Sequence, residues 1–225
     1  MADNEINIID DRFEERNLMV EFQLLRRGIT NEAVLASMLA VPRHIFVPYN
    51  RQVDAYLDSP LLIGEGQTIS QPFIVALMAQ ALEPSKLETV LEIGTGSGYS
   101  AAVLAQVFAT VYTVERHKSL AKDAQEKFEK LGYDNIKVLI GDGTKGWPDQ
   151  APYDAIISTA GGPKVPPGLY QQLRVGGRLV IPVGEELTQQ RLLRFRLQPD
   201  GKFTEEDLGE VRFVPLIGEE GWKED

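Results

Sequence analysis

The sequence contains no cysteine and only two histidines, His44 and His117. Without cysteine, the chain has no disulfide bond, no thiolate nucleophile and no thiolate metal ligand. Two histidines are too few for a multi-histidine metal centre, so we expect no metal site. These absences exclude catalysis by a cysteine nucleophile and disfavour catalysis at a metal held by cysteines or several histidines.

Long apolar runs and basic clusters are also missing. No uninterrupted apolar stretch is long enough to span a membrane, and the acidic N-terminus has no hydrophobic signal core. The 23 Lys and Arg stand against 33 Asp and Glu, a formal net charge of −10, and no basic patch for nucleic acid is visible. We therefore expect a cytoplasmic monomer with neither nucleic acid nor a membrane as partner. Acidic residues gather near both ends, which favours solubility: Asp3, Glu5, Asp10, Asp11, Glu14, Glu15, Glu219, Glu220, Glu224 and Asp225.

Length and composition favour one α/β domain. The chain has 225 residues, of which 43% are hydrophobic, and this is enough for a full core. No linker, repeat or low-complexity tract divides it. Within the single domain we expect a helical and substrate-loop region over about 1–82 and a cofactor-binding sheet over about 83–225.

The centre of the chain is the stretch 90–99, an apolar run that ends in glycines at 94, 96 and 98. The run predicts a buried strand, and the alternating glycines predict a turn where the backbone passes close to another group. Residues 100–107 have helix composition. Strand, glycine turn and helix form the first unit of a nucleotide-binding α/β sheet.

Three successive predicted strands end near an acid. Glu92 precedes the glycine turn, Glu115 ends the strand that begins at Thr110, and Asp142 follows the strand 136–140. The carboxyl ends of parallel strands share one crevice, and an acid about 20 residues beyond the glycines commonly holds ribose hydroxyls. The spacing G-x-G-x-G and Glu92 disfavour a dinucleotide, whose fingerprint is G-x-G-x-x-G. A cationic ligand without phosphate, S-adenosylmethionine, suits these acids better.

The remaining segments predict how this sheet is completed. A helix over about 12–27 carries Phe13, Leu18, Phe22 and Leu25 at the spacing of one face, and Thr30 is a candidate cap for the next helix. Residues 60–72 have the composition of an irregular loop, with Ser70 as the N-cap of a helix led by Pro72. Further strands are predicted over 153–158, 176–183, 191–197 and 210–214, the last two forming an antiparallel hairpin at the edge.

These residues and motifs resemble the protein-L-isoaspartate O-methyltransferase family. The resemblance covers nearly the whole chain, and its most specific part is residues 67–72. It implies a Rossmann-like, doubly wound, mostly parallel seven-stranded sheet with an antiparallel C-terminal hairpin and an N-terminal helical extension. The matching segments are 41–43, 64–72, 90–99, 114–116, 141–143, 176–178 and 211–216.

The resemblance also implies a role for individual residues. Glu92 and residues 94–98 would face S-adenosylmethionine, with Glu115 on the ribose hydroxyls. Asp142 and Gly143 would face the adenine edge, and His117 would stack on adenine where the family has an apolar residue. The glycine-turn residues are Gly94, Thr95, Gly96, Ser97 and Gly98. On the substrate side, Thr68, Ile69 and the active-site Ser70 would line the isoaspartyl pocket. Phe213 and Val214 would run beside the substrate peptide.

The implied reaction methylates the α-carboxyl of L-isoaspartyl residues in damaged proteins, which is a repair step. A carboxylate with a pKa near 4 is already ionised at pH 7, so the reaction needs no general base. Three alternatives remain at this stage: a methyltransferase for RNA or a small molecule, a binding module without turnover, and a nicotinamide dehydrogenase. The net charge disfavours RNA, the intact motifs disfavour a binding module, and the glycine spacing disfavours the dehydrogenase.

Overall fold

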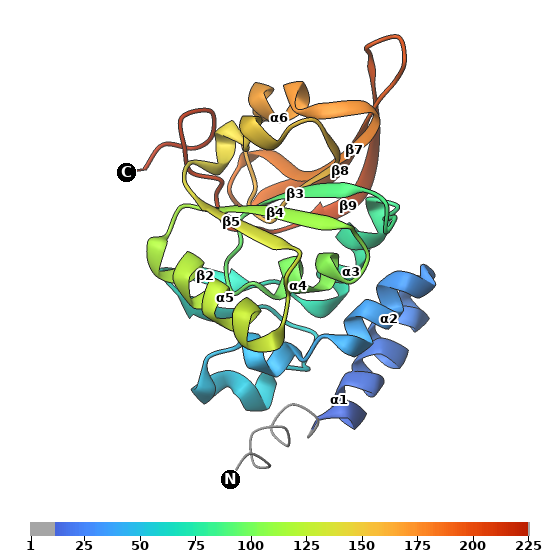
Figure 1. Cartoon of the computed structure of the whole chain (residues 1–225), viewed down its shortest axis with the longest axis vertical. Coiled ribbons are helices and arrows are strands. Elements are labelled where there is room, and N and C mark those ends of the chain that lie inside the picture. The colour runs from blue at the N-terminus through green and yellow to red at the C-terminus, as the bar shows by residue number, and fades with distance from the viewer. Residues whose placement is uncertain (1–11, 225) are drawn as a thin grey trace.

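The computed structural model describes residues 12–224 and contains one seven-stranded sheet in the order β5-β4-β3-β6-β7-β8-β9 (Figure 1). The pairs β5-β4, β4-β3, β3-β6 and β6-β7 are parallel, whereas β7-β8 and β8-β9 are antiparallel. The predicted fold class is confirmed, including the antiparallel hairpin at the edge. The strands are β3 (Thr89–Ile93), β4 (Thr110–Glu115), β5 (Ile136–Ile140), β6 (Tyr153–Ser158), β7 (Leu173–Glu186), β8 (Gln189–Leu197) and β9 (Phe203–Val211).

Helices cover both faces of the sheet (Figure 1). The helices α3 (Pro72–Ala81), α4 (Tyr99–Ala105) and α5 (Lys118–Leu131) share one hydrophobic core, and α6 (Pro167–Gln171) belongs to the core of the other face. Neighbouring strand residues alternate between the two cores, as the pleat requires: Val90 joins the first and Leu91 the second. Short 3-10 segments are η4 (Arg43–Phe46), η5 (Tyr49–Asp54), η6 (Gly143–Lys145) and η7 (Pro148–Gln150).

The predicted first helix is present, but its buried face differs from the apolar pattern. It consists of α1 (Phe13–Leu18), a π-helical stretch (Met19–Leu24) and a 3-10 turn (Leu25–Arg27), and it ends at Gly28 with φ 95°. The four apolar residues of the pattern are about half exposed, and Met19 and Leu24 are buried instead. A π-helical turn has more than 3.6 residues, so it rotates the face that a regular helix would bury.

The second helix, α2 (Glu32–Ala40), is capped by Asn31 and not by Thr30. The Asn31 side chain accepts a hydrogen bond of 3.1 Å from the backbone N–H of Val34. The prediction of Thr30 as the cap is therefore wrong by one residue. Helices α2 and α3 pack together in the core of the first sheet face, which ties the N-terminal extension to the domain.

Residues 60–72 are more regular than predicted. They contain a two-stranded antiparallel hairpin, β1 (Leu61–Gly64) and β2 (Gln67–Ile69), in place of an irregular loop. The N-cap of α3 is Gln71, with Pro72 in the first turn and no side-chain cap bond. Ser70 is therefore not the cap, which corrects the structural role predicted for it.

The last strand begins and ends earlier than expected. The predicted strand 210–214 overlaps β9 only at its end, because β9 starts directly after the turn at 199–202. Phe213 and Val214 lie beyond that strand, so the prediction of a strand at these two residues is wrong. The acidic residues Asp3, Glu5, Asp10, Asp11 and Asp225 lie outside the described residues. Across 12–224, none of the helices is long and apolar enough to cross a membrane.

Candidate active site

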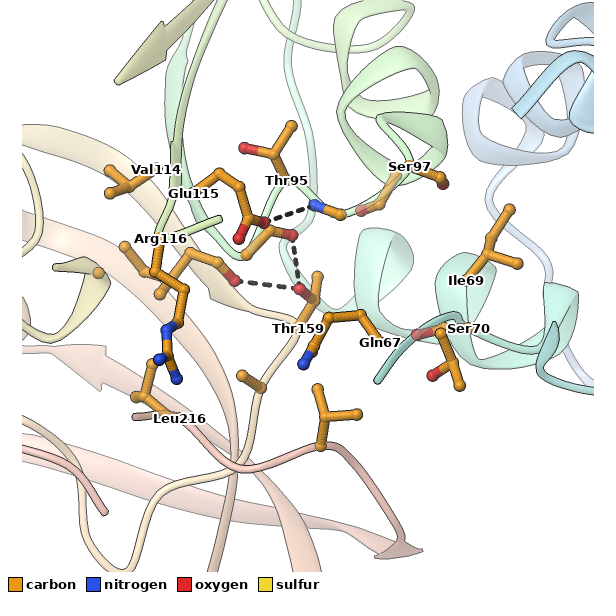
Figure 2. A pocket seen from close by; sticks show the side chains of 18 of the residues that line it. Gln67, Ile69, Ser70, Thr95, Ser97, Val114, Glu115, Arg116, Thr159 and Leu216 are labelled. Carbon is orange, nitrogen blue, oxygen red and sulfur yellow. Dashed lines mark hydrogen bonds between the residues drawn. The ribbon is translucent and has the colours of Figure 1, made fainter. Parts of the chain in front are cut away.

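A cavity lies at the carboxyl ends of β3, β4 and β6, beside the glycine turn (Figure 2). In this view Thr95 and Glu115 stand on one side, and Ile69 and Ser70 on the other. The cavity thus brings together the glycine turn and the loop before α3, as predicted. The predicted site residues that line it are Thr68, Ile69, Ser70, Gly94, Thr95, Gly96, Ser97, Glu115, His117, Gly143 and Val214.

The glycine turn is shaped by Thr159, which follows β6. The Thr159 hydroxyl donates to the backbone oxygen of Gly94 at 2.7 Å, as Figure 2 shows. Gly94 has φ 94°, and a Cβ at this position would lie 2.4 Å from the Thr159 Oγ1. Only glycine fits both the backbone conformation and the contact, so the turn can pass close to the cavity.

Glu115 connects the glycine turn to the next loop. One carboxylate oxygen accepts from the backbone N–H of Gly96 at 2.8 Å, and the other accepts from that of His117 at 2.9 Å. The residue is buried and lines the cavity. Each carboxylate oxygen has a further lone pair, so Glu115 can also accept from hydroxyl groups of a ligand.

His117 lies at the start of α5 and lines the same cavity. Its Nε2 is buried and makes no hydrogen bond within residues 12–224. Its Nδ1 lies 3.9 Å from a carboxylate oxygen of Glu65, at the tip of the β1-β2 hairpin, and Glu65 also accepts from Ser119 at 2.6 Å. A buried ring nitrogen without a partner leaves a polar position open for a ligand.

Two of the three predicted acids do not line the cavity. Glu92 is fully buried and accepts from the Thr113 hydroxyl at 2.6 Å, and burial raises its pKa to about 7. Asp142 accepts from Thr144 and from the backbone N–H of Glu219 at 2.8 Å, so it holds the C-terminal segment. Neither residue lines the cavity, and the direct ligand contacts predicted for Glu92 and Asp142 stay predictions.

Gly98 and Phe213 also lie outside the lining of this cavity. A Cβ on Gly98 would come within 2.8 Å of the Phe128 ring, so this glycine allows α5 to pack closely against α4. Phe213 lies instead along a second groove. The glycine turn therefore combines ligand-facing and packing positions, which the motif alone does not separate.

The second groove runs beside β8 and the end of β9 and meets the cavity. Thr68, Ser70, Thr159 and Val214 line both. The Ser70 hydroxyl makes no hydrogen bond to any other residue of the described chain, so its donor is available at this junction. A small ligand in the cavity and an extended chain in the groove would meet beside Ser70.

Several lining residues were not among the predicted site residues. Thr159 belongs to a loop of small residues, and only its contacts show its role. Arg116, which pairs with Glu224, follows Glu115 directly. Leu216 ends the matching segment 211–216 and Ile217 follows it, so extending the predicted peptide segment beyond Val214 points to both.

The comparisons with known proteins agree with this geometry. A profile of the family described as Protein-L-isoaspartate(D-aspartate) O-methyltransferase matches residues 14–221. This chain belongs to that family. A protein-L-isoaspartate O-methyltransferase of Pelotomaculum thermopropionicum is 57% identical over 96% of this chain and 94% of its own length. Another from Geotalea uraniireducens is 54% identical over 96% of this chain and 99% of its own.

Solved structures of the protein-L-isoaspartate O-methyltransferase family have the same fold. One superposes with a TM-score of 0.83 at 31% identity and covers 92% of this chain and 67% of its own. A second, from Plasmodium falciparum, holds S-adenosyl-L-homocysteine and superposes with a TM-score of 0.76 at 27% identity, covering 90% of this chain and 98% of its own. The chain is an O-methyltransferase of this family.

Proposed function

We propose that this chain transfers a methyl group from S-adenosylmethionine to the α-carboxylate of L-isoaspartyl residues in damaged proteins and peptides. The observation that carries the proposal is the junction of cavity and groove at Thr68, Ser70, Thr159 and Val214. A methyl donor in the cavity and a peptide in the groove would place their reacting groups there. Family membership and the relatives' names point to the same reaction.

The residues of the cavity fit S-adenosylmethionine. Gly94, Gly96 and Gly143 lie in its wall without side chains, and a Cβ on Gly143 would lie 2.5 Å from Ile93, another lining residue. Glu115 would hold the ribose hydroxyls, and the unpartnered Nε2 of His117 would lie near the base. When bound, S-adenosylmethionine supplies an electrophilic methyl group on a sulfonium.

The chain's own residues then have to position the substrate. The isoaspartyl carboxylate has a pKa near 4, so at pH 7 it is a nucleophile without any proton transfer. The Ser70 hydroxyl would donate a hydrogen bond to this carboxylate, and Thr68 and Ile69 would form the pocket wall. Proximity and alignment alone can lower such a barrier by about 7–11 kcal/mol. Without the enzyme, the ester formed would cyclise to a succinimide with loss of methanol, and water would reopen the ring partly to normal aspartate.

One experiment tests the proposed function. We would measure S-adenosylhomocysteine release with an isoaspartyl peptide and with its normal aspartyl twin, and we expect release only with the first. Equal release from both peptides would contradict the proposal and favour another methyl acceptor. Binding of S-adenosylmethionine without release from either peptide would indicate a binding module.

A further inference from the structure

Gln190, on β8, is a buried amide in the wall of the groove, with 2% of its surface exposed. Its Oε1 accepts from the backbone N–H of Phe213 at 2.8 Å. Its Nε2 donates to the backbone oxygens of Phe213 at 3.3 Å and of Leu187 at 3.4 Å. The orientation of the amide is fixed by chemistry, because an N–H can only donate and a carbonyl oxygen can only accept.

This amide replaces a strand partner. The backbone of Gln190 pairs with Val211, which is the last residue of β9. Two residues further on, the side chain of Gln190 bonds both backbone groups of Phe213. At Phe213 the path of the chain is therefore set by this side chain, and backbone bonds to Gly161 hold the residues that follow.

The next residue of this segment is held from the other side. The oxygen of Val214 accepts from the backbone N–H of Gly161 at 2.9 Å. A Cβ on Gly161 would lie 2.6 Å from the Gln190 Nε2, so glycine is needed for the amide to reach Phe213. Within the described chain, the N–H of Val214 makes no hydrogen bond, and Val214 lies at the junction with Ser70.

We propose that Gln190 is a positioning residue for the substrate: it holds residues 213–214 so that Val214 offers its backbone N–H to the isoaspartyl peptide. This rests on the proposed function. An extended peptide that adds to a backbone edge gains main-chain hydrogen bonds, and their strength depends on the placement of that edge. Gln190 and Phe213 line the groove and not the cavity, so loss of the amide acts first on the peptide and less on the cofactor.

The test uses Gln190→Met, which keeps the length of the side chain and removes its hydrogen bonds. We expect KM for the isoaspartyl peptide to rise about tenfold or more, the scale of one or two lost hydrogen bonds. The dissociation constant of S-adenosylhomocysteine, measured by calorimetry, should stay within about twofold. Gln198→Met is the matched control, because the hydrogen bonds of Gln198 within the described chain stay inside the β8-β9 hairpin, to Gly201, Lys202 and Thr204. It should change neither value.

A second variant displaces the same amide without replacing it. Gly161→Ala puts a methyl group against the flexible end of Gln190, which must move away from Phe213, and the same selective rise in KM is expected. If Gln190→Met fails to fold, Gly161→Ala alone tests whether the amide positions the substrate. An unchanged KM in both variants overturns the inference, as does an equal loss of cofactor affinity, which would mean a purely structural role. Failure of the unmodified chain to methylate any isoaspartyl peptide would instead refute the proposed function.

Discussion

The Ser70 hydroxyl has no partner within the described chain and no role as a helix cap. We therefore predict that Ser70→Ala leaves the free energy of unfolding within about 0.5 kcal/mol of the unmodified protein. Turnover of an isoaspartyl peptide should fall about 10- to 100-fold, because a hydrogen bond to a charged group is worth about 1.5–3 kcal/mol. Steady-state kinetics measure turnover, urea unfolding measures stability, and calorimetry measures the affinity for S-adenosylhomocysteine.

The affinity for S-adenosylhomocysteine serves as the internal control for Ser70→Ala, since the hydroxyl is predicted to face the substrate. Unchanged turnover would show that Ser70 is not a positioning donor. A large loss of stability would show that the hydroxyl has a structural partner after all.

At the scale of single residues, the sequence predicted which segments meet but not which side chains face the cavity. Glu115 was placed correctly beside the glycine turn. Glu92 and Asp142 also follow the pattern of an acid near a strand end, yet they bind Thr113 and the backbone of Glu219. Those partners come from other strands or from the C-terminal segment, so spacing along one strand carries no information about them.

Helix starts offer a direct test at the scale of elements. Asn31 accepts from the N–H of Val34, whereas Thr30, the residue that the pattern favours, makes no such bond. Asn31→Ala should lower the free energy of unfolding by about 1 kcal/mol, the usual cost of a lost N-cap. Thr30→Ala, as the matched control, should cost only a few tenths. Urea unfolding measures the free energy of unfolding of both variants. A larger loss for Thr30→Ala than for Asn31→Ala would mean that Thr30 is the cap.

Strands with a clear hydrophobic pattern were predicted well. Strands whose pairing depends on an unusual turn or on a position at the sheet edge were predicted less well. The strands β5 and β6 match their predicted ranges. The β1-β2 hairpin was missed because its turn places Glu65 at φ 50°, without the Asn-Gly or Asp-Gly pair that announces such turns. Strand β9 was placed too late because its outer residues, such as Glu205 and Asp207, lie exposed at the sheet edge and give no apolar alternation.

At the scale of the whole molecule, the parallel direction of β3, β4 and β5 followed from the unit of strand, glycine turn and helix. The order of the edge strands and the junction of cavity and groove did not. That junction joins residues near 68, 159 and 214, which come from three separate parts of the chain. Only the folded sheet and the segment held by Gln190 bring them together, so no local pattern contains this information.

Glu92 makes the stability of the protein depend on pH, and a variant can separate its contribution from that of the other titrating groups. Burial raises its pKa from 4.5 to about 7, so between these values the folded chain keeps a proton that the unfolded chain has released. The free energy of unfolding therefore falls as pH rises through this window, by about 3 kcal/mol from this group. Glu92→Gln removes the titration but keeps an acceptor for Thr113.

The difference in unfolding free energy between Glu92→Gln and the unmodified protein should consequently shift by about 3 kcal/mol in favour of the variant from pH 4.5 to pH 8. Urea unfolding at several pH values measures it, and other titrating groups cancel in the difference. Glu126→Gln is the control, since Glu126 forms an exposed pair with Lys122. A difference that stays constant with pH would mean that Glu92 ionises in the folded chain as readily as in water, and that its burial is relieved by a partner or by solvent.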